Sequence, residues 1–291
     1  MRFFLNFLTV LLAFTIPSCN QQTKGDLNPG KERELTEEFK SYWYNNTAEI
    51  TSYSLEMERY GEMREGTAVL IYVTEDFLAN EQVKANRRDE ETIPILKLNS
   101  TKNFMTGIYP YSMMSSTFYP VLIESHALKV STSIQEWCGN TYAQINNRNA
   151  FEITSHSYFQ HEADQNFNLE KTWLEDEFWT LLRIDPAALP TGEITVIPSL
   201  EFTRLRHKTI QPMRTIATFT EEETVFSYSL YYPSLERTLT IRFQKEAPFV
   251  IEEWEEQIGE YTSRAIKIEQ IQADYWNNTS NTEESMREEL F

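Results

Sequence analysis

The sequence predicts a mainly β fold: a large curved antiparallel sheet, forming a half-barrel or a sandwich, with one or two short helices. About a dozen short runs alternate apolar and polar residues, a pattern typical of strands with one dry and one wet face. Gly, Pro, Asn and Asp separate many of these runs and indicate turns. A sheet of so many strands curls, splits or closes rather than staying flat.

The N-terminus has the pattern of an export signal. Arg2 precedes the apolar run FFLNFLTVLLAFTI, which is too short and too interrupted for a membrane span. Ile16-Pro17-Ser18-Cys19 then resembles the bacterial lipobox, in which the cysteine is diacylated and becomes the new N-terminus. Two or more acyl chains hold a protein firmly on a bilayer. We therefore predict a signal peptide over residues 1–18 and lipidation at Cys19; the alternative is a plain signal peptide with a chance cysteine.

Three further regions follow Cys19. Residues 19–33 are polar, contain glycine and proline, and are predicted to be a flexible lipidated tether. Residues 34–276 are predicted to form the β-rich domain, and residues 277–291 an acidic C-terminal tail. With this anchor the protein is expected in the bacterial cell envelope, as an outer membrane lipoprotein, and its first partner is the membrane that holds the lipid.

Within the domain, two segments have helical periodicity and the others have strand periodicity. The helices are expected at 34–44 and 169–184, the second with Asn168 as cap and Asp185-Pro186 as stop. Residues 50–75 are expected to form a hairpin around the turn GEMREG. In FEITSHSYF the alternation places Phe151, Ile153, Ser155 and Ser157 on one face. The other expected strands are IPILKL, HALKVSTS, NTYAQIN, GEITVIPS, TIATFT, VFSYSLYY, RTLTIRFQ, FVIEEW and AIKIEQIQADYW.

Composition excludes several classes of function. The chain carries a net charge of −18, which argues against a nucleic-acid partner. Its 18 Phe, 15 Tyr and 6 Trp supply material for a large core. Of the two cysteines, only Cys138 remains once Cys19 is lipidated, so no intrachain disulfide is expected. No HExxH, CxxC, GxGxxG, phosphate-loop or GxSxG motif is present, so we predict no metal and no cofactor.

Two stretches supply candidate ligand-binding residues. TGIYPYSMMSSTFYP could line an adaptable apolar pocket, although such a run is more often core around a turn. RLRHK, residues 204–208, is the densest basic cluster; as a strand, it would place its two arginines and its lysine on one face, where they suit a carboxylate or phosphate. With QEWCGNTY, these stretches give the candidate set Tyr109, Tyr111, Met113, Trp137, Cys138, Arg204, Arg206 and His207.

Catalysis has little support in the sequence. Trp137-Cys138-Gly139 is similar to a thioredoxin-type motif, but Thr141 stands where the second cysteine would be. Nothing in the sequence brings a histidine to Cys138 as a base. Carboxylates are abundant, which makes any one pair uninformative. No catalytic residue is assigned, and a lone cysteine beside tryptophan is more often a small buried hydrophobe.

Four stretches resemble a family of Bacteroidota lipoproteins without an established activity, and the similarity covers most of the chain after the signal. Some members carry the label of Maf-type septum-formation inhibitor, which implies a cytosolic nucleotide pyrophosphatase with an SxSPRR-like motif near its start. No such motif stands here, so the label is unsupported for this chain. The stretches are FKSYWYNNTAEITSYSLEMERYGEMREGTAVLIYVTEDF, LKLNSTKNFMTGIYPYSMMSSTFYPV, ALKVSTSIQEWCGNTYAQIN and LPTGEITVIPSLEFTRLRHK.

The sequence therefore favours a lipid-anchored binding domain for an apolar or amphipathic small molecule. Lipoprotein carriers whose curved sheet surrounds an apolar cavity are an architectural analogy. Two alternatives belong to other classes: an envelope hydrolase that uses carboxylates or Cys138, and an envelope scaffold that contacts another protein. A reactive thiol at Cys138 would favour the hydrolase, and a protein contact of the acidic tail would favour the scaffold.

Overall fold

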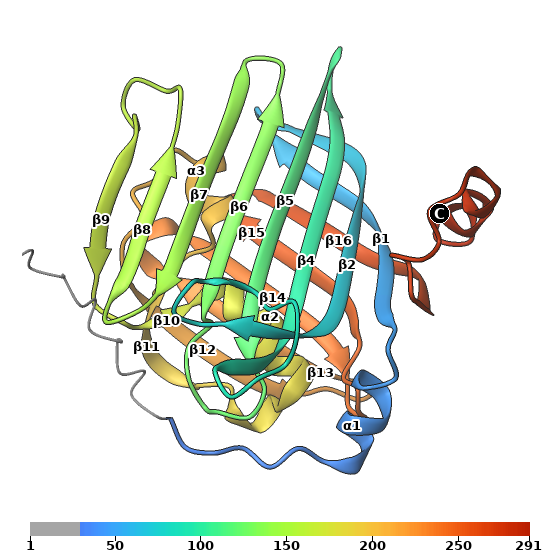
Figure 1. Cartoon of the computed structure of the whole chain (residues 1–291). Coiled ribbons are helices and arrows are strands. Elements are labelled where there is room, and N and C mark those ends of the chain that lie inside the picture. Colours follow the sequence, from blue (N-terminus) through green and yellow to red (C-terminus); the bar gives the residue numbers. More distant parts are fainter. Residues whose placement is uncertain (1–29) are drawn as a thin grey trace, which may run out of the picture.

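A computed structural model describes residues 30–291, so the predicted signal peptide and Cys19 lie outside the described residues. It confirms the expected fold class, because the described chain forms one large, unclosed, mainly antiparallel sheet. The sheet folds over on itself, with β4 to β9 in front and β12 to β16 behind (Figure 1). None of the helices in the described part is long and apolar enough to cross a bilayer.

Two long strands, β1 and β2, connect the back layer to the rest of the front layer. In sheet order its strands run β1, β2, β4, β5, β6, β7, β8 and β9, with β3 paired to β2 alone. Their bounds are β1 Ala48–Arg59, β2 Glu62–Leu78, β3 Val83–Lys84, β4 Thr92–Thr106, β5 Tyr109–Pro120, β6 Lys129–Glu136, β7 Gly139–Asn147, β8 Phe151–His156 and β9 Gln165–Leu169.

The back layer continues from the other side of β1. Its sheet order is β16, β15, β14, β13, β12, β11 and β10, and only β10 pairs in parallel. The bounds are β10 Trp173–Leu174, β11 Gly192–Ile197, β12 Met213–Glu221, β13 Val225–Tyr232, β14 Arg237–Gln244, β15 Ile251–Ile258 and β16 Tyr261–Ala273. β9 and β10 are consecutive in the chain yet end the sheet on opposite edges, so the sheet does not close through them.

Curvature comes from twist and from local breaks in register. Sheets twist with a fixed hand, and long strands accumulate that twist. The pairing of β1 with β16 shifts at Ser52/Tyr53, and the pairing of β14 with β15 shifts at Arg242/Phe243. Each irregularity bends its strand. In β2, a Cβ on Gly66 would lie 2.3 Å from the backbone oxygen of Asn103 in β4, so these two strands approach closely only because residue 66 is glycine.

Helix α2, Glu175–Ile184, lies between the two layers (Figure 1). Phe178, Leu181 and Leu182 are buried and belong to the main core together with side chains of both layers. Complete burial of each contributes about 1.5–3 kcal/mol. The large curved sheet that the sequence predicted is therefore present, with a helix between its two layers.

Helix α2 begins six residues later than predicted. Residues 165–169 pair with β8 as an edge strand, and Trp173–Leu174 pair with β11, so this stretch is not available to the helix. Its start is fixed by Glu177, whose carboxylate accepts a hydrogen bond from the Leu174 backbone N–H at 3.1 Å. Its end, before Asp185-Pro186, agrees with the prediction.

The remaining helices lie at the ends of the layers. α1, Glu37–Trp43, confirms the first predicted helix and buries Phe39 and Trp43. α3, Leu200–Leu205, was not predicted. In the acidic tail, α4 spans Ser285–Glu288, and Leu290 packs on an apolar cluster formed by β1, β2 and β16.

Candidate functional site

An open cleft of about 380 Å³ lies between α3 and the inner face of β6, β7 and β8. Helix α3 lies toward the end of the molecule where the β4–β5 and β6–β7 hairpins turn, whereas α1 lies at the other end (Figure 1). Volumes of this size are typical of small-molecule sites. The cleft is the candidate functional site, and we call it the α3 cleft.

The floor of the α3 cleft is hollow because its side chains are small. Thr132 of β6 pairs with Ala143 of β7, and Ala143 pairs with Ser155 of β8. One pleat further along, the inward positions of the same strands hold Val130, Ile145 and Ile153, which are buried in the core. Ser155 and Ser157 line the cleft on the face of Ile153, as the alternation in FEITSHSYF predicted.

The opposite wall is α3, which is capped by Ser199 and tied to α2 and β1. The Ser199 hydroxyl caps its start by accepting from the Phe202 N–H at 3.2 Å. The Leu200 N–H donates to Asp176 of α2 at 3.2 Å, and the Leu205 carbonyl accepts from Arg59 of β1 at 2.7 Å. These bonds hold the helix over the sheet.

Burial gives Asp176 an unusual titration. Desolvation, followed by the charge of the adjacent Glu175, raises the pKa of Asp176 to about 7, although the hydrogen bond from Leu200 opposes the shift. The Asp176 carboxyl, which accepts a hydrogen bond from the first residue of α3, therefore titrates near neutral pH.

Three basic side chains line the α3 cleft: Arg204, His207 and Lys208. The Arg204 guanidinium lies 4.1 Å from the centre of the Phe159 ring, and its Nε donates to the Thr141 hydroxyl at 3.1 Å. His207 pairs with Glu162 at 2.5 Å.

The expectation that RLRHK is a strand is wrong. Arg204 and Leu205 end α3, Arg206 caps it, and His207 adopts a left-handed backbone with φ of 51°. The alternation of basic and apolar residues in this pentapeptide was coincidental. Because this stretch ends a helix, the two arginines point in different directions. Arg204 lines the cleft, whereas Arg206 forms an ion pair with Glu58 at 2.5 Å.

The aromatic candidates lie outside the α3 cleft. Tyr111 and Met113 face the core from β5 and are buried, and the Tyr111 hydroxyl bonds Tyr60 at 2.7 Å. Tyr109 lies beside Trp137, with 6.2 Å between ring centres, and Trp137 is 68% exposed at the β6–β7 turn. The stretch TGIYPYSMMSSTFYP is thus mostly the strand β5. Its buried side chains belong to the core, which was the favoured interpretation, and do not line a pocket with the other candidates.

Cys138 sits beside Trp137 in the same turn and is exposed, so the expectation of a buried hydrophobe is wrong. A hydrogen bond to Glu136, together with the negative charge of that carboxylate, raises the pKa of the Cys138 thiol. Its backbone N–H donates to the same carboxylate at 2.6 Å. Because the thiolate is the nucleophile, this environment disfavours reaction at neutral pH.

A second, smaller cavity of about 70 Å³ lies in the interior on the other side of α3. Its charged walls are paired: Lys102 with Glu201 at 2.6 Å, and Arg237 with Glu175 at 2.7 Å. The volume accommodates a few water molecules and is far below that of a drug-sized ligand. The first pair joins β4 of the front layer to α3, and the second joins β14 of the back layer to α2.

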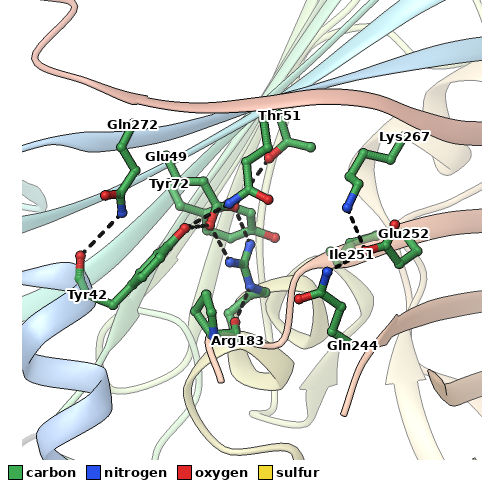
Figure 2. Close-up of polar contacts among 12 residues, drawn as sticks. Tyr42, Glu49, Thr51, Tyr72, Arg183, Gln244, Ile251, Glu252, Lys267 and Gln272 are labelled. Carbon is green, nitrogen blue, oxygen red and sulfur yellow. Dashed lines mark hydrogen bonds and ion pairs between the residues drawn. The ribbon is translucent and has the colours of Figure 1, made fainter. Parts of the chain in front are cut away.

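A buried ion pair fixes the far end of α2 (Figure 2). Arg183 donates both terminal nitrogens to Glu49 of β1 at 2.6 and 2.7 Å, and its Nε donates to the Pro248 carbonyl. Tyr42 of α1 adds a hydrogen bond to Glu49 at 2.6 Å. The cluster joins α1, α2 and β1.

A wider hollow of about 620 Å³ lies next to the first described residues. Arg33 forms part of its wall and donates to the Val121 carbonyl at 3.2 Å. His126 is paired with Glu177 at 2.9 Å, and that carboxylate raises its pKa against the effect of burial. The α3 cleft, in which Arg204, His207 and Lys208 converge, is kept as the candidate functional site.

Within residues 30–291, no group of three or more His, Cys, Asp or Glu side chains is placed to hold a metal ion. Sequence reasoning found Arg204 and His207 but missed Phe159, Thr141 and Lys208 as their companions in the cleft. Lys208 stood in the same basic cluster and could have been included. Phe159 and Thr141 lie more than forty positions earlier, and only the tertiary fold brings them to α3.

Comparisons with known proteins identify no relative by sequence: no family model and no curated protein matches this chain. Among solved structures, it is similar to a beta-barrel-like protein of Domain of Unknown Function DUF1849 from Brucella abortus. The two share 9% identity and a TM-score of 0.49, over 78% of this chain and 98% of that one. A likeness at this level assigns no family and no activity to the protein.

Proposed function

We propose that the protein is a lipid-anchored binding protein of the bacterial envelope, and that its β-rich domain takes an apolar or amphipathic small molecule into the α3 cleft. The observation that carries the proposal is the cleft itself. About 380 Å³ of space lies over small side chains of three strands, with a basic wall on α3. Pockets that combine an apolar lining with a few convergent polar groups are typical ligand sites.

The proposed chemistry is non-covalent. Ala143 on the floor, with Phe159 and Ile210, offers apolar surface to a chain or ring. Each square ångström of apolar surface removed from water contributes about 25 cal/mol, so even a short alkyl chain gains binding energy there. The basic side chains would then set the orientation of the polar end.

Filling the cleft tests the proposal. Ala143→Phe places a ring over the floor, and the expected result is at least a tenfold weaker binding of decanoate, measured by isothermal titration calorimetry. The protein used is the chain from Asn20 onward, which contains every described element. Ser131→Phe, which adds the same ring to the outer face of β6, is the matched control and should bind as the wild type does. Equal affinity of all three proteins would contradict the proposal.

A further inference from the structure

Arg204 has a donor that no described residue satisfies. Its Nε is bonded to Thr141 and its planar group is stacked on Phe159, so the guanidinium is held in one orientation. The Nη1 atom is buried and has no hydrogen-bond partner among residues 30–291. A buried donor on a charged group is costly to leave unpaired, and native proteins rarely do so without a reason.

The charge of Arg204 is also uncompensated at contact distance. Among the described residues, no carboxylate comes within 4.0 Å of Arg204 or of Lys208. Glu162 is the carboxylate that acts on Arg204, but it already pairs with His207 and accepts from the Ser157 hydroxyl at 2.6 Å. By contrast, the buried Arg183 and Arg237 each contact a carboxylate through two nitrogens.

The electrostatic surroundings favour an added negative charge. Burial, and the positive charge of Arg59, lower the pKa of Arg204, and the charge of Glu162 only partly opposes them. An anion placed at Nη1 would supply both the missing acceptor and the missing charge. Arginine binds carboxylate and phosphate oxygens through charge-assisted hydrogen bonds, which are stronger than neutral ones.

We propose that Arg204 binds the anionic group of an amphipathic ligand, a carboxylate or a phosphate monoester, with Lys208 at the cleft rim adding a second positive charge. The inference rests on the proposed function, because it places this group in the same α3 cleft. The ligand's apolar part then extends over Ala143 and Ile210, which line the same cleft. The ligand class is therefore an alkyl or acyl chain that ends in an anion.

Three probes with the same chain test this inference by calorimetry at pH 8: decanoate, decyl phosphate and the neutral decanol. We expect the wild type to bind at least one of the two anions ten times more tightly than decanol. Arg204→Gln should abolish that preference and leave decanol binding unchanged. Arg214→Gln removes the same charge from an exposed pair on β12 and should keep the preference.

The two anions distinguish the two possible anionic groups of the ligand. Tighter binding of decyl phosphate indicates a phosphate monoester, and tighter binding of decanoate indicates a carboxylate. Equal affinity of the wild type for all three probes would overturn the anion site while leaving the cleft as an apolar site. Absence of binding by every probe would overturn the proposed function as well. The preference of the wild type is informative by itself, so the test does not depend on the folding of a variant.

Discussion

Arg183, Arg237 and Arg204 differ in how their positive charges are compensated. Arg183 and Arg237 are almost wholly buried and meet carboxylates, and the attraction of those carboxylates raises the pKa of each guanidinium despite the cost of burial. Arg204 is stacked and partly buried, yet its remaining donor has no partner in the described chain. The difference separates charges that hold the fold together from one that is available to a ligand.

The Glu49–Arg183 pair gives a prediction about stability. Arg183→Met leaves a buried carboxylate without its partner, so we expect the free energy of unfolding to fall by about 3–5 kcal/mol. Urea denaturation of the variant and the wild type measures this difference in the free energy of unfolding. Arg214→Met, in an exposed pair with Glu193, should cost less than about 1 kcal/mol.

The double variant Glu49→Leu, Arg183→Met tests whether the unpaired Glu49 carboxylate causes the loss of stability. Replacing both charges by apolar groups removes the desolvation penalty, so this protein should be more stable than Arg183→Met alone. If the double variant is instead the less stable of the two, the loss in Arg183→Met does not come from an unpaired carboxylate.

At the level of single residues, the sequence predicted part of the site. The basic cluster at 204–208 pointed to Arg204 and His207, which do line the α3 cleft. It could not distinguish Arg204 from Arg206, because the separation depends on the helical turn and on the position of Glu58 in β1. Tyr111 and Met113 face inward because β5 lies in the middle of the front layer, which local composition does not reveal.

Among the elements, α3 is central to the proposed function, because it forms one wall of the α3 cleft. Its six residues are held by contacts to α2, β1 and β4 and not by helical propensity, since helices this short are marginal by themselves. Asp176 of α2 makes the contact with the first turn of α3, and the carboxyl of Asp176 titrates near neutral pH.

The raised pKa of Asp176 predicts how stability depends on pH. In the unfolded chain the carboxyl has a pKa of about 3.9, and in the folded protein it is about 7. Between these values the folded state keeps a proton that the unfolded state releases, so this group lowers the free energy of unfolding as pH rises from about 4 to about 7. Asp176→Asn should remove that decline.

Urea denaturation at pH 4.5 and at pH 8 checks this expectation. The stability of Asp176→Asn relative to wild type should rise between the two values, on the order of 1.4 kcal/mol for each pH unit crossed. Asparagine keeps an oxygen that can accept from the Leu200 N–H, so the start of α3 stays capped. Parallel stability profiles for the two proteins would mean that Asp176 has an ordinary pKa.

Strands were easier to predict than helices, for a physical reason. A strand with one buried face shows alternation locally, and most predicted runs lie in strands with matching faces, such as Phe151 and Ile153 in β8. The strand β9 was missed because residues 165–169 lie on an edge and bury little. The helix α3 was not predicted because the alternation in RLRHK favours a strand, whereas the helix start is marked by Ser199 alone as an N-cap.

The whole molecule has two distinct ends. The described chain begins at the end near α1, and the α3 cleft lies toward the opposite end (Figure 1). In the proposed lipoprotein, the ten residues between Cys19 and Gly30 span at most about 40 Å when extended. The cleft would then open away from the attachment point, accessible to a molecule that arrives from the aqueous side.

Lipidation at Cys19 gives the prediction for the whole molecule. Metabolic labelling with a clickable palmitate analogue should mark the wild type and leave Cys19→Ser unmarked, and that variant should leave the membrane fraction. Cys138→Ser changes the other cysteine of the chain and should be labelled like the wild type. A labelled Cys19→Ser protein, or an unlabelled wild type found in the cytosol, would contradict the anchor.

The central claim is that the α3 cleft holds the ligand by its anionic end. A crystal structure of the chain from Asn20 onward, soaked with decyl phosphate, tests it most directly. The account predicts the phosphate within hydrogen-bond distance of Arg204 Nη1 and the alkyl chain over Ala143. Decyl phosphate bound in the hollow beside Arg33 and His126, with the α3 cleft filled by water alone, would contradict it.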